Sequence, residues 1–434
     1  MPTSDLRSRL QRLRVQKARR DSAPVAPSVP VSALTPRRAP APGEGLPGEE
    51  MLTPQGAFQL VANAYPLSRV HGLWPLAAWL ERDSATAARL ISPAAGQVDL
   101  RSLAFIDIET TGLAGGTGTL AFLIGAGAYQ GDQFMLRQYF LRDPAEEDAM
   151  LNQLVEDLAP ATGWVTFNGR AFDLPILETR LTLNQQRDAL GQRPNLDLLP
   201  LARRLYRGRL PSCALGDLEK HVIGLQRDQE DVPGALIPQM YLDYLRTRDP
   251  GDMRRVIYHN AMDILSMATL GAHLLAAFAT PLEAGPARAL APLPAAEAGA
   301  QQPEVVLRLG NWHADNGRDE AAETAYRLAL SAKLSLDDRR QGLTRLAALL
   351  KRQDRRQEAA ALWEQLASFS TEDPEPFFEL AKYYEWHASD LTQAMAWTKR
   401  ALRLVAGWAD DWRRAEIEGE LKHRLDRLKS KSGK

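Results

Sequence analysis

Two acidic residues close the apolar segment Leu103–Ile108. Asp107 and Glu109 are two positions apart, so in a β-strand both side chains would point to the same face. Two carboxylates held together repel one another, and a pair of divalent cations removes that repulsion. Mg²⁺ and Mn²⁺ prefer hard oxygen ligands, and two ions roughly 3.5–4 Å apart can hold both the attacking and the leaving oxygen of a phosphodiester. Because an Asp-x-Glu sequence is common, the rest of the chain decides whether this chemistry applies.

Three separate runs of sequence resemble the three motifs of the DEDD nuclease superfamily. They occur in the superfamily's order, as Phe105–Leu113 (FIDIETTGL), Thr166–Asp173 (TFNGRAFD) and His259–Asp263 (HNAMD). The glycine-rich stretch Gly115–Gly125 is similar to the YprB-like ribonuclease-H-fold proteins, some of which also carry C-terminal tetratricopeptide repeats. The resemblance covers residues 100–275 well and the C-terminal third more loosely.

The resemblance implies a 3′–5′ exonuclease that acts on single-stranded nucleic acid with two Mg²⁺ or Mn²⁺ ions. The implied metal ligands are Asp107, Glu109, Asp173 and Asp263. Thr110 and Leu113 match positions that hold the terminal nucleotide, although Leu113 fits ordinary packing equally well. Asn168 either orients Asp173 or caps a turn.

Similar enzymes place a proton-transfer residue just before the last aspartate, as a tyrosine four positions earlier or a histidine five earlier. Here the two are exchanged, with His259 at four and Tyr258 at five. Four residues of helix turn roughly 400°, so His259 would lie about 40° from Asp263 and Tyr258 about 140° from it. We therefore expect His259 to accept the proton from water, because its reference pKa is near 6.5. An alternative is that His259 only forms a hydrogen bond to a ligand carboxylate. Tyr258 would be the other candidate if the helix began after Asn260.

The remaining pattern predicts a sheet and then a helical array. Strands are expected over Leu103–Ile108, Leu120–Tyr129, Gln133–Leu141 and Trp164–Phe167, and helices over Pro144–Leu158 and Phe172–Leu183. Similar segments starting at Leu309, Leu346 and Leu380 are 37 and 34 residues apart, close to the tetratricopeptide period. The expected fold class is α/β, a ribonuclease-H-like mixed five-stranded sheet flanked by helices and followed by an all-α tetratricopeptide-like region.

Composition shifts divide the chain into six regions. They are a disordered basic arm and Pro/Ala-rich linker (1–50), a helical extension (51–99), the ribonuclease-H-like domain (100–279), an Ala/Pro-rich linker (280–302), tetratricopeptide-like repeats (303–412) and a basic tail (413–434). Such repeats typically bind a protein partner or brace a neighbouring domain.

Bulk composition limits the alternatives. The 434 residues carry a formal net charge of −1, so any nucleic-acid affinity must come from local basic surface such as Leu201–Arg209, where four arginines surround Tyr206. An exposed helix face accounts for that stretch as well. The single cysteine, Cys213, excludes an intramolecular disulfide and suits the cytoplasm. Ile264–Ala279 is too short for a membrane span, which needs roughly 18–20 apolar residues.

Two other functions fit the same residues. The first is a catalytically inactive scaffold or nucleic-acid-binding protein that acts through the repeats. The exchanged positions of His259 and Tyr258 favour this function. The second is an endonuclease that uses the same ions. The complete set of four acids favours an active exonuclease over the scaffold.

Overall fold

The computed structural model describes residues 45–92, 96–112, 117–228, 231–279, 303–409 and 412–432. The expected linker 280–302, most of the arm 1–50 and the substrate-binding candidate Leu113 lie outside these residues.

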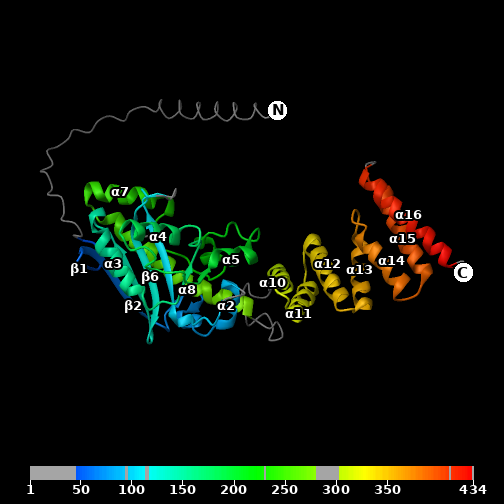
Figure 1. Cartoon of the computed structure of the whole chain (residues 1–434), viewed down its shortest axis with the longest axis horizontal. Coiled ribbons are helices and arrows are strands. Elements are labelled where there is room, and N and C mark those ends of the chain that lie inside the picture. Colours follow the sequence, from blue (N-terminus) through cyan, green and yellow to red (C-terminus); the bar gives the residue numbers. More distant parts are fainter. Residues whose placement is uncertain are drawn as a thin grey trace, which may run out of the picture. The chain divides into compact units, whose positions relative to one another are not determined.

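A mixed sheet of seven strands forms the centre of the first domain (Figure 1). Its order is β1-β2-β7-β6-β5-β8-β9, with β5, β8 and β9 parallel and the other neighbours antiparallel. The strands are β1 (Glu49–Thr53), β2 (Gly56–Pro66), β5 (Leu103–Thr110), β6 (Ala121–Gln130), β7 (Gln133–Phe140), β8 (Gly163–Thr166) and β9 (Asn195–Asp197). The predicted mixed sheet is confirmed, with seven strands instead of the five expected.

The two additional strands belong to the region for which helices were predicted. Residues 51–99 hold most of β1, all of β2, the short strands β3 (Val70–His71) and β4 (Trp74–Pro75), η1 (Leu76–Trp79) and α2 (Ser84–Ile91). The prediction of a helical extension is therefore wrong. Thr53 pairs directly with Gly56, so Pro54 and Gln55 form a tight hairpin turn, and β2 then pairs along β7.

Helices cover both faces of the sheet. They are η2 (Leu100–Ser102), η3 (Pro144–Glu146), α3 (Glu147–Leu158), α4 (Asp173–Leu183), α5 (Leu198–Tyr206), α6 (Leu215–His221), η4 (Gly234–Leu236), α7 (Ile237–Thr247) and α8 (Gly251–Ala279). Phe105 of β5 belongs to the core that contains α5 and α8, whereas Ile106 belongs to the core that contains α3, α4 and α7. Because strand side chains alternate, Asp107 and Glu109 share the face of Phe105 and point toward α8.

Helix α8 is apolar because it is the central helix of the domain. It has 29 residues, and an 18-residue window of it has a mean hydropathy of 1.5, so by length and composition it passes as a membrane span. The apolar segment Ile264–Ala279, expected to be too short for a span, is the C-terminal part of this longer helix. However, 83% of the window is buried inside the protein, and α8 contacts β5, β6, α5, α6 and α7. We assign it as a core helix.

The C-terminal region is all-helical. It consists of α10 (Pro303–Asp315), α11 (Asp319–Ser331), α12 (Leu336–Arg352), α13 (Arg356–Phe369), α14 (Glu375–Trp386), α15 (Leu391–Ala406) and α16 (Trp412–Ser432). The first six helices pack as three consecutive hairpins. Ala359 and Ala394 are fully buried in this region. Most of the region 413–434, which was expected to be a basic tail, lies in helix α16, which packs on α15.

Candidate metal centre

Asp107 is held in place by an amide from α8. Nδ2 of Asn260 donates to Oδ2 of Asp107 at 2.8 Å and to its backbone oxygen at 3.2 Å. Asn260 is fully buried, and Nε2 of Gln138 donates to its Oδ1 at 2.8 Å. Gly125 lies opposite Asp107 on β6, and a Cβ at this position would clash with the Asn260 amide. The absence of a side chain at Gly125 therefore leaves room for that amide. Buried hydrogen bonds thus orient the first carboxylate.

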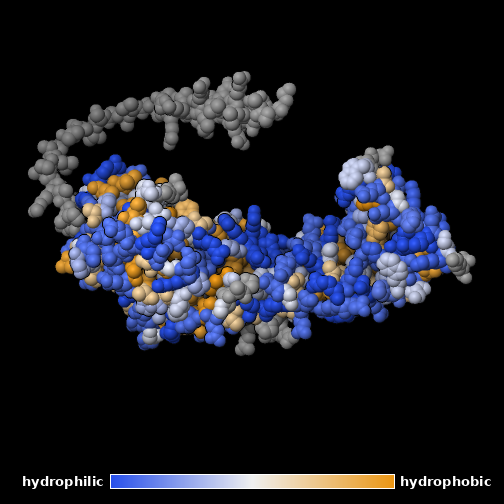
Figure 2. Space-filling view, viewed as in Figure 1, coloured by the Kyte–Doolittle hydropathy of each residue, from blue (hydrophilic) through white to orange (hydrophobic). Residues whose placement is uncertain are grey.

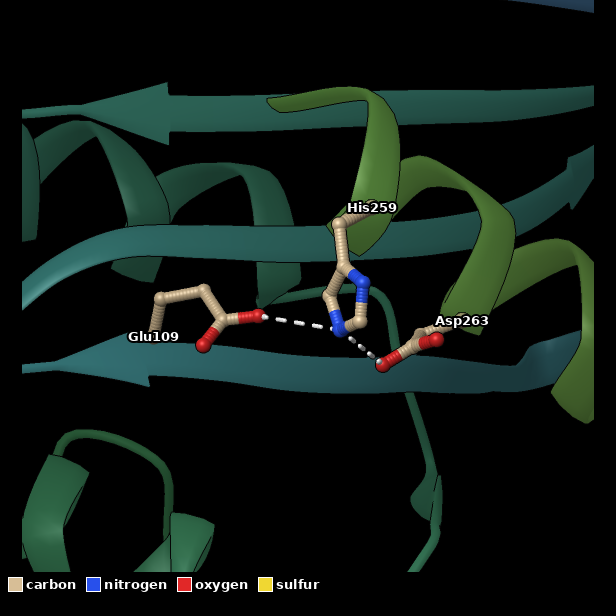
Figure 3. A group of neighbouring side chains, drawn as sticks. All are labelled: Glu109, His259 and Asp263. Atoms are coloured by element: carbon tan, nitrogen blue, oxygen red, sulfur yellow. Dashed lines mark ion pairs between the residues drawn. The ribbon is translucent and has the colours of Figure 1, made fainter. Parts of the chain in front are cut away.

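Helix α8 also presents His259 and Asp263, one turn apart, to Glu109 (Figure 3). Nε2 of His259 lies 3.5 Å from Oδ2 of Asp263 and 4.0 Å from Oε1 of Glu109. One ligand atom from each of the three residues lies within 4.8 Å of the others, close enough to hold a common ion. His259 was predicted as the proton acceptor and not as a ligand, so its place in this group is a new feature.

Asp173 joins the second sequence motif to the first. It is the first residue of α4, it is 7% exposed, and its Oδ1 accepts a hydrogen bond from the backbone N–H of Ile108 at 3.3 Å. Ile108 lies between Asp107 and Glu109 on β5. The structure therefore brings Asp173 beside the two strand carboxylates, where it and Asp107 flank the group of Glu109, His259 and Asp263.

Burial and mutual repulsion disfavour the charged forms of the carboxylates. Burial, followed by the charges of Asp263, Glu109 and Asp173, raises the pKa of Asp107 well above its usual range. Burial and the charges of Asp263 and Asp173 do the same to the pKa of Glu109. Burial raises the pKa of Asp173 to about 7. A bound cation would remove the cause of these shifts, because it would offset the desolvation and the repulsion together.

Arg227 is the main site residue that the sequence did not reveal. Its guanidinium contacts Oδ1 of Asp263 and forms two bonds to Glu219 of α6, at 2.7 and 2.5 Å. The Glu219 side chain is 2% exposed and that of Arg227 is 10% exposed, so this is a buried ion pair. No motif flags Arg227, because its role arises only when the segment after α6 packs against α8.

Asp231 is a second partner that the sequence did not reveal. Nδ1 of His259 lies 2.6 Å from Oδ1 of Asp231. Burial acts to raise the pKa of Asp231, but the bond to His259 and the charge of Arg227 together lower it. An ionised carboxylate can only accept, so this shorter contact favours the proton of a neutral His259 on Nδ1, although Nη1 of Arg227, which can only donate, lies 3.2 Å from the same nitrogen. Nε2 then carries the free lone pair and faces Glu109 and Asp263.

The choice between His259 and Tyr258 can now be made on geometry. Helix α8 begins at Gly251, well before Asn260, so the condition that favoured Tyr258 is not met. The Tyr258 hydroxyl bonds to Asp228, and burial followed by this bond raises its pKa. Of the two side chains, His259 is the one directed at the acidic group.

The other candidates lie at the ends of β5 and β8. Thr110 is 7% exposed at the end of β5, where its Oγ1 donates to the backbone oxygen of Gly112 at 2.8 Å. Asn168 follows β8 with a left-handed φ of 69°, and its backbone N–H donates to Asp197 at 2.8 Å. This conformation matches the turn interpretation of Asn168.

The arginine-rich stretch Leu201–Arg209 does not present an aromatic ring to a ligand. Tyr206 is 5% exposed, and its hydroxyl lies 2.7 Å from Nε2 of His273. Arg209 is paired with Asp338 at 2.6 Å. The interpretation of this stretch as a stacking surface was therefore wrong. Arg203 and Arg204 are exposed on α5, and Arg207 is exposed directly after it.

Comparison with known proteins agrees with this geometry. Residues 104–275, which include the four acids and His259, match a family described as belonging to the RNase H superfamily. The chain is also 32% identical over 378 residues to the uncharacterized protein YprB of Bacillus subtilis (strain 168), covering 85% of this chain and 84% of that protein. The chain belongs to the YprB family of the RNase H superfamily. The aligned length exceeds the sheet domain, so the relationship to YprB extends into the flanking regions. Membership in this superfamily suggests a nuclease-like domain that binds nucleic acid.

Proposed function

We propose that residues 100–279 form a metal-dependent 3′–5′ exonuclease that hydrolyses the terminal phosphodiester bond of single-stranded nucleic acid. The observation that carries this proposal is the convergence of Asp107, Glu109, Asp173 and Asp263 from β5, α4 and α8. Asp107 and Glu109 belong to the first motif, Asp173 to the second and Asp263 to the third. Burial and the charges of neighbouring carboxylates raise the pKa values of the first three.

The residues present fit a divalent metal site. The donor set consists of hard carboxylate oxygens, as Mg²⁺ and Mn²⁺ require, and these oxygens are disfavoured as anions without a cation. When bound, two such ions would activate water and stabilise the leaving oxygen of the phosphodiester. Asp107, Glu109, Asp173 and Asp263 would hold them.

The protein side of the reaction follows from the same contacts. Asn260 keeps Asp107 in one rotamer, and Asp231 keeps the proton of His259 on Nδ1, so that Nε2 can accept a proton from water. Arg227 anchors Asp263. Thr110 and Leu113 would contact the terminal nucleotide, with Asn168 shaping the turn before Asp173. The helical array would act as tetratricopeptide-like repeats that engage a protein partner or the nucleic acid.

One observation favours a second function, a catalytically inactive scaffold. The guanidinium of Arg227 already contacts Oδ1 of Asp263, and a tethered cation can satisfy an acidic residue that no longer binds metal. In that case the fold would serve only to bind nucleic acid or a partner protein.

A single-strand degradation assay separates these functions. The full chain is incubated with Mn²⁺ and two oligonucleotides of one sequence, labelled at the 5′ end and at the 3′ end respectively. We expect a ladder of shortening products from the 5′-labelled strand and immediate release of a mononucleotide from the 3′-labelled strand. Asp107→Asn should abolish both, whereas Asp132→Asn on the exposed β6–β7 turn should not. Internal cuts would indicate an endonuclease, and binding without cleavage would indicate a scaffold.

A further inference from the structure

Two buried glutamates in the helical array hold five cations. Glu379 of α14 lies 2.5 Å from Nζ of Lys351 and 2.8 Å from Nζ of Lys382. Glu385, also on α14, accepts from three residues of α16, namely Arg424 at 2.8 Å, Arg427 at 2.9 Å and Lys431 at 2.6 Å. The Glu379 and Glu385 side chains are only 7% and 1% exposed.

This arrangement leaves a positive surface. Burial acts to raise the pKa of each glutamate, but the surrounding cations lower it, so both are ionised. Five positive charges around two buried negative charges leave three uncompensated. The two carboxylates are buried, whereas the side chains of Arg427 and Lys431 are 41% and 48% exposed. Because the glutamates hold the cations in place, a ligand would not have to order them.

Aromatic rings lie among these cations. Trp386, the last residue of α14, is 55% exposed, and the guanidinium of Arg424 lies 5.3 Å from its ring centroid. Trp386 and Tyr383 line a cavity of about 240 Å³ between α12, α13 and α14, together with Trp363 and Arg356. The ring of Tyr383 is stacked on that of His387. The one face of the array that Figure 2 shows is predominantly hydrophilic.

We propose that this surface, formed by Lys351, Lys382, Trp386, Arg424, Arg427 and Lys431, binds single-stranded nucleic acid. The cations would contact backbone phosphates, and Trp386 would stack on a base, the combination that single-strand-binding modules use. The choice of ligand rests on the proposed nuclease function, but the binding itself requires no cleavage. The array would then hold the strand whose 3′ end the first domain degrades.

The test compares two triple variants of the full chain that change the net charge equally. The first is Lys382→Ala/Arg427→Ala/Lys431→Ala, which leaves Lys351 on Glu379 and Arg424 on Glu385, so neither buried carboxylate loses its last partner. The control is Arg246→Ala/Arg327→Ala/Arg345→Ala, at exposed positions of α7, α11 and α12. Binding of a fluorescent strand of roughly 20 nucleotides, longer than typical single-strand sites, is followed by anisotropy in EDTA.

We expect the first variant to bind the strand at least about tenfold more weakly than the wild type. The slope of log K against log salt concentration should also become shallower by about two, because each of the three lost phosphate contacts contributes roughly 0.7 to it. The control should bind nearly as the wild type does. Trp386→Ala should weaken binding about tenfold, and Trp386→Phe should retain most of it because a ring remains. Circular dichroism confirms that each variant is folded.

Equal binding by the two triple variants would overturn the proposal. So would displacement of the strand by polyglutamate as efficiently as by unlabelled strand, because the surface would then recognise an acidic protein. Because EDTA prevents cleavage, the anisotropy assay measures binding alone. A negative degradation assay would therefore refute the proposed exonuclease without affecting the proposed binding surface. Equal binding by the two triple variants would refute the binding surface without affecting the proposed exonuclease.

Discussion

Nε2 of His259 lies 3.5 Å from Oδ2 of Asp263, one turn along α8, while Nδ1 of the same ring lies 2.6 Å from Asp231. The imidazole is thus oriented on one side by a carboxylate that accepts its proton and faces the acidic group on the other.

Asp107→Asn should stabilise the metal-free protein while it abolishes cleavage. Burial and three neighbouring carboxylates raise the pKa of Asp107, so its charged form costs free energy. A neutral isostere removes that cost, roughly 1–2 kcal/mol, and should raise the unfolding midpoint by about 2–4 °C. Thermal unfolding in EDTA measures this, with Asp132→Asn as an exposed control that should leave the midpoint unchanged. A lowered midpoint would mean that the carboxylates do not repel one another as described.

Arg227→Gln should strongly destabilise the protein. Glu219 is buried, and its bidentate partner would be lost, which typically costs about 3–5 kcal/mol. The double variant Glu219→Gln/Arg227→Gln should recover part of that loss, because Glu219 no longer leaves a buried charge unpaired while Asp263 still lacks its guanidinium partner. Urea unfolding of both variants gives the comparison. If the single variant is as stable as the wild type, the guanidinium does not anchor the site.

Gly125→Ala should displace Asn260 from Asp107. The added Cβ would clash with the buried amide, so we expect a loss of about 1–3 kcal/mol of stability together with reduced cleavage. Gly419→Ala on α16, where a Cβ meets open space, should be neutral or slightly stabilising. If the clash is the cause, Gly125→Ala should add little destabilisation in an Asn260→Ala background. Full additivity of the two changes would refute the contact.

Titration of His273 should lower the stability of the protein as the pH falls from about 6.5 toward 4, whereas the raised pKa values of the site carboxylates act in the opposite direction. Burial, followed by the charge of Arg82, lowers the pKa of His273 to about 4, whereas the unfolded chain titrates near 6.5. In this window the unfolded state binds the proton first, so acid favours unfolding, by about 2 kcal/mol at pH 5. His273→Gln should remove this contribution, and so raise the unfolding free energy at pH 5 relative to that at pH 6.5 when compared with the wild type. The exposed His387→Gln should not, and identical slopes for the wild type and His273→Gln would contradict the burial argument.

Local periodicity was sufficient to place two pairs of site residues, whereas the grouping of the four acids came from the resemblance to the nuclease motifs. Alternation along a strand placed Asp107 and Glu109 on one face, and the four-residue spacing placed His259 beside Asp263. Both patterns involve neighbours within one element, so they do not depend on how elements pack. The same is true of the strands and helices around them.

The remaining features depend on tertiary packing. Arg227 and Asp231 reach the site because the segment between α6 and α7 packs on α8, and no short-range pattern encodes that. Residues 57–64 of β2 are alanine-rich and by propensity favour a helix, yet pairing with β7 makes them a strand. The Pro54-Gln55-Gly56 turn was the local signal that could have revealed the hairpin.

Four carboxylates from three separate segments of the chain are proposed to bind divalent ions together. A Mn²⁺ titration followed by electron paramagnetic resonance tests this most directly. We expect two ions per wild-type chain, and a loss of at least one of them in each of Asp107→Asn, Glu109→Gln, Asp173→Asn and Asp263→Asn, with Asp132→Asn unchanged. Binding of Mn²⁺ at full stoichiometry and affinity by any one of the four variants would contradict the account.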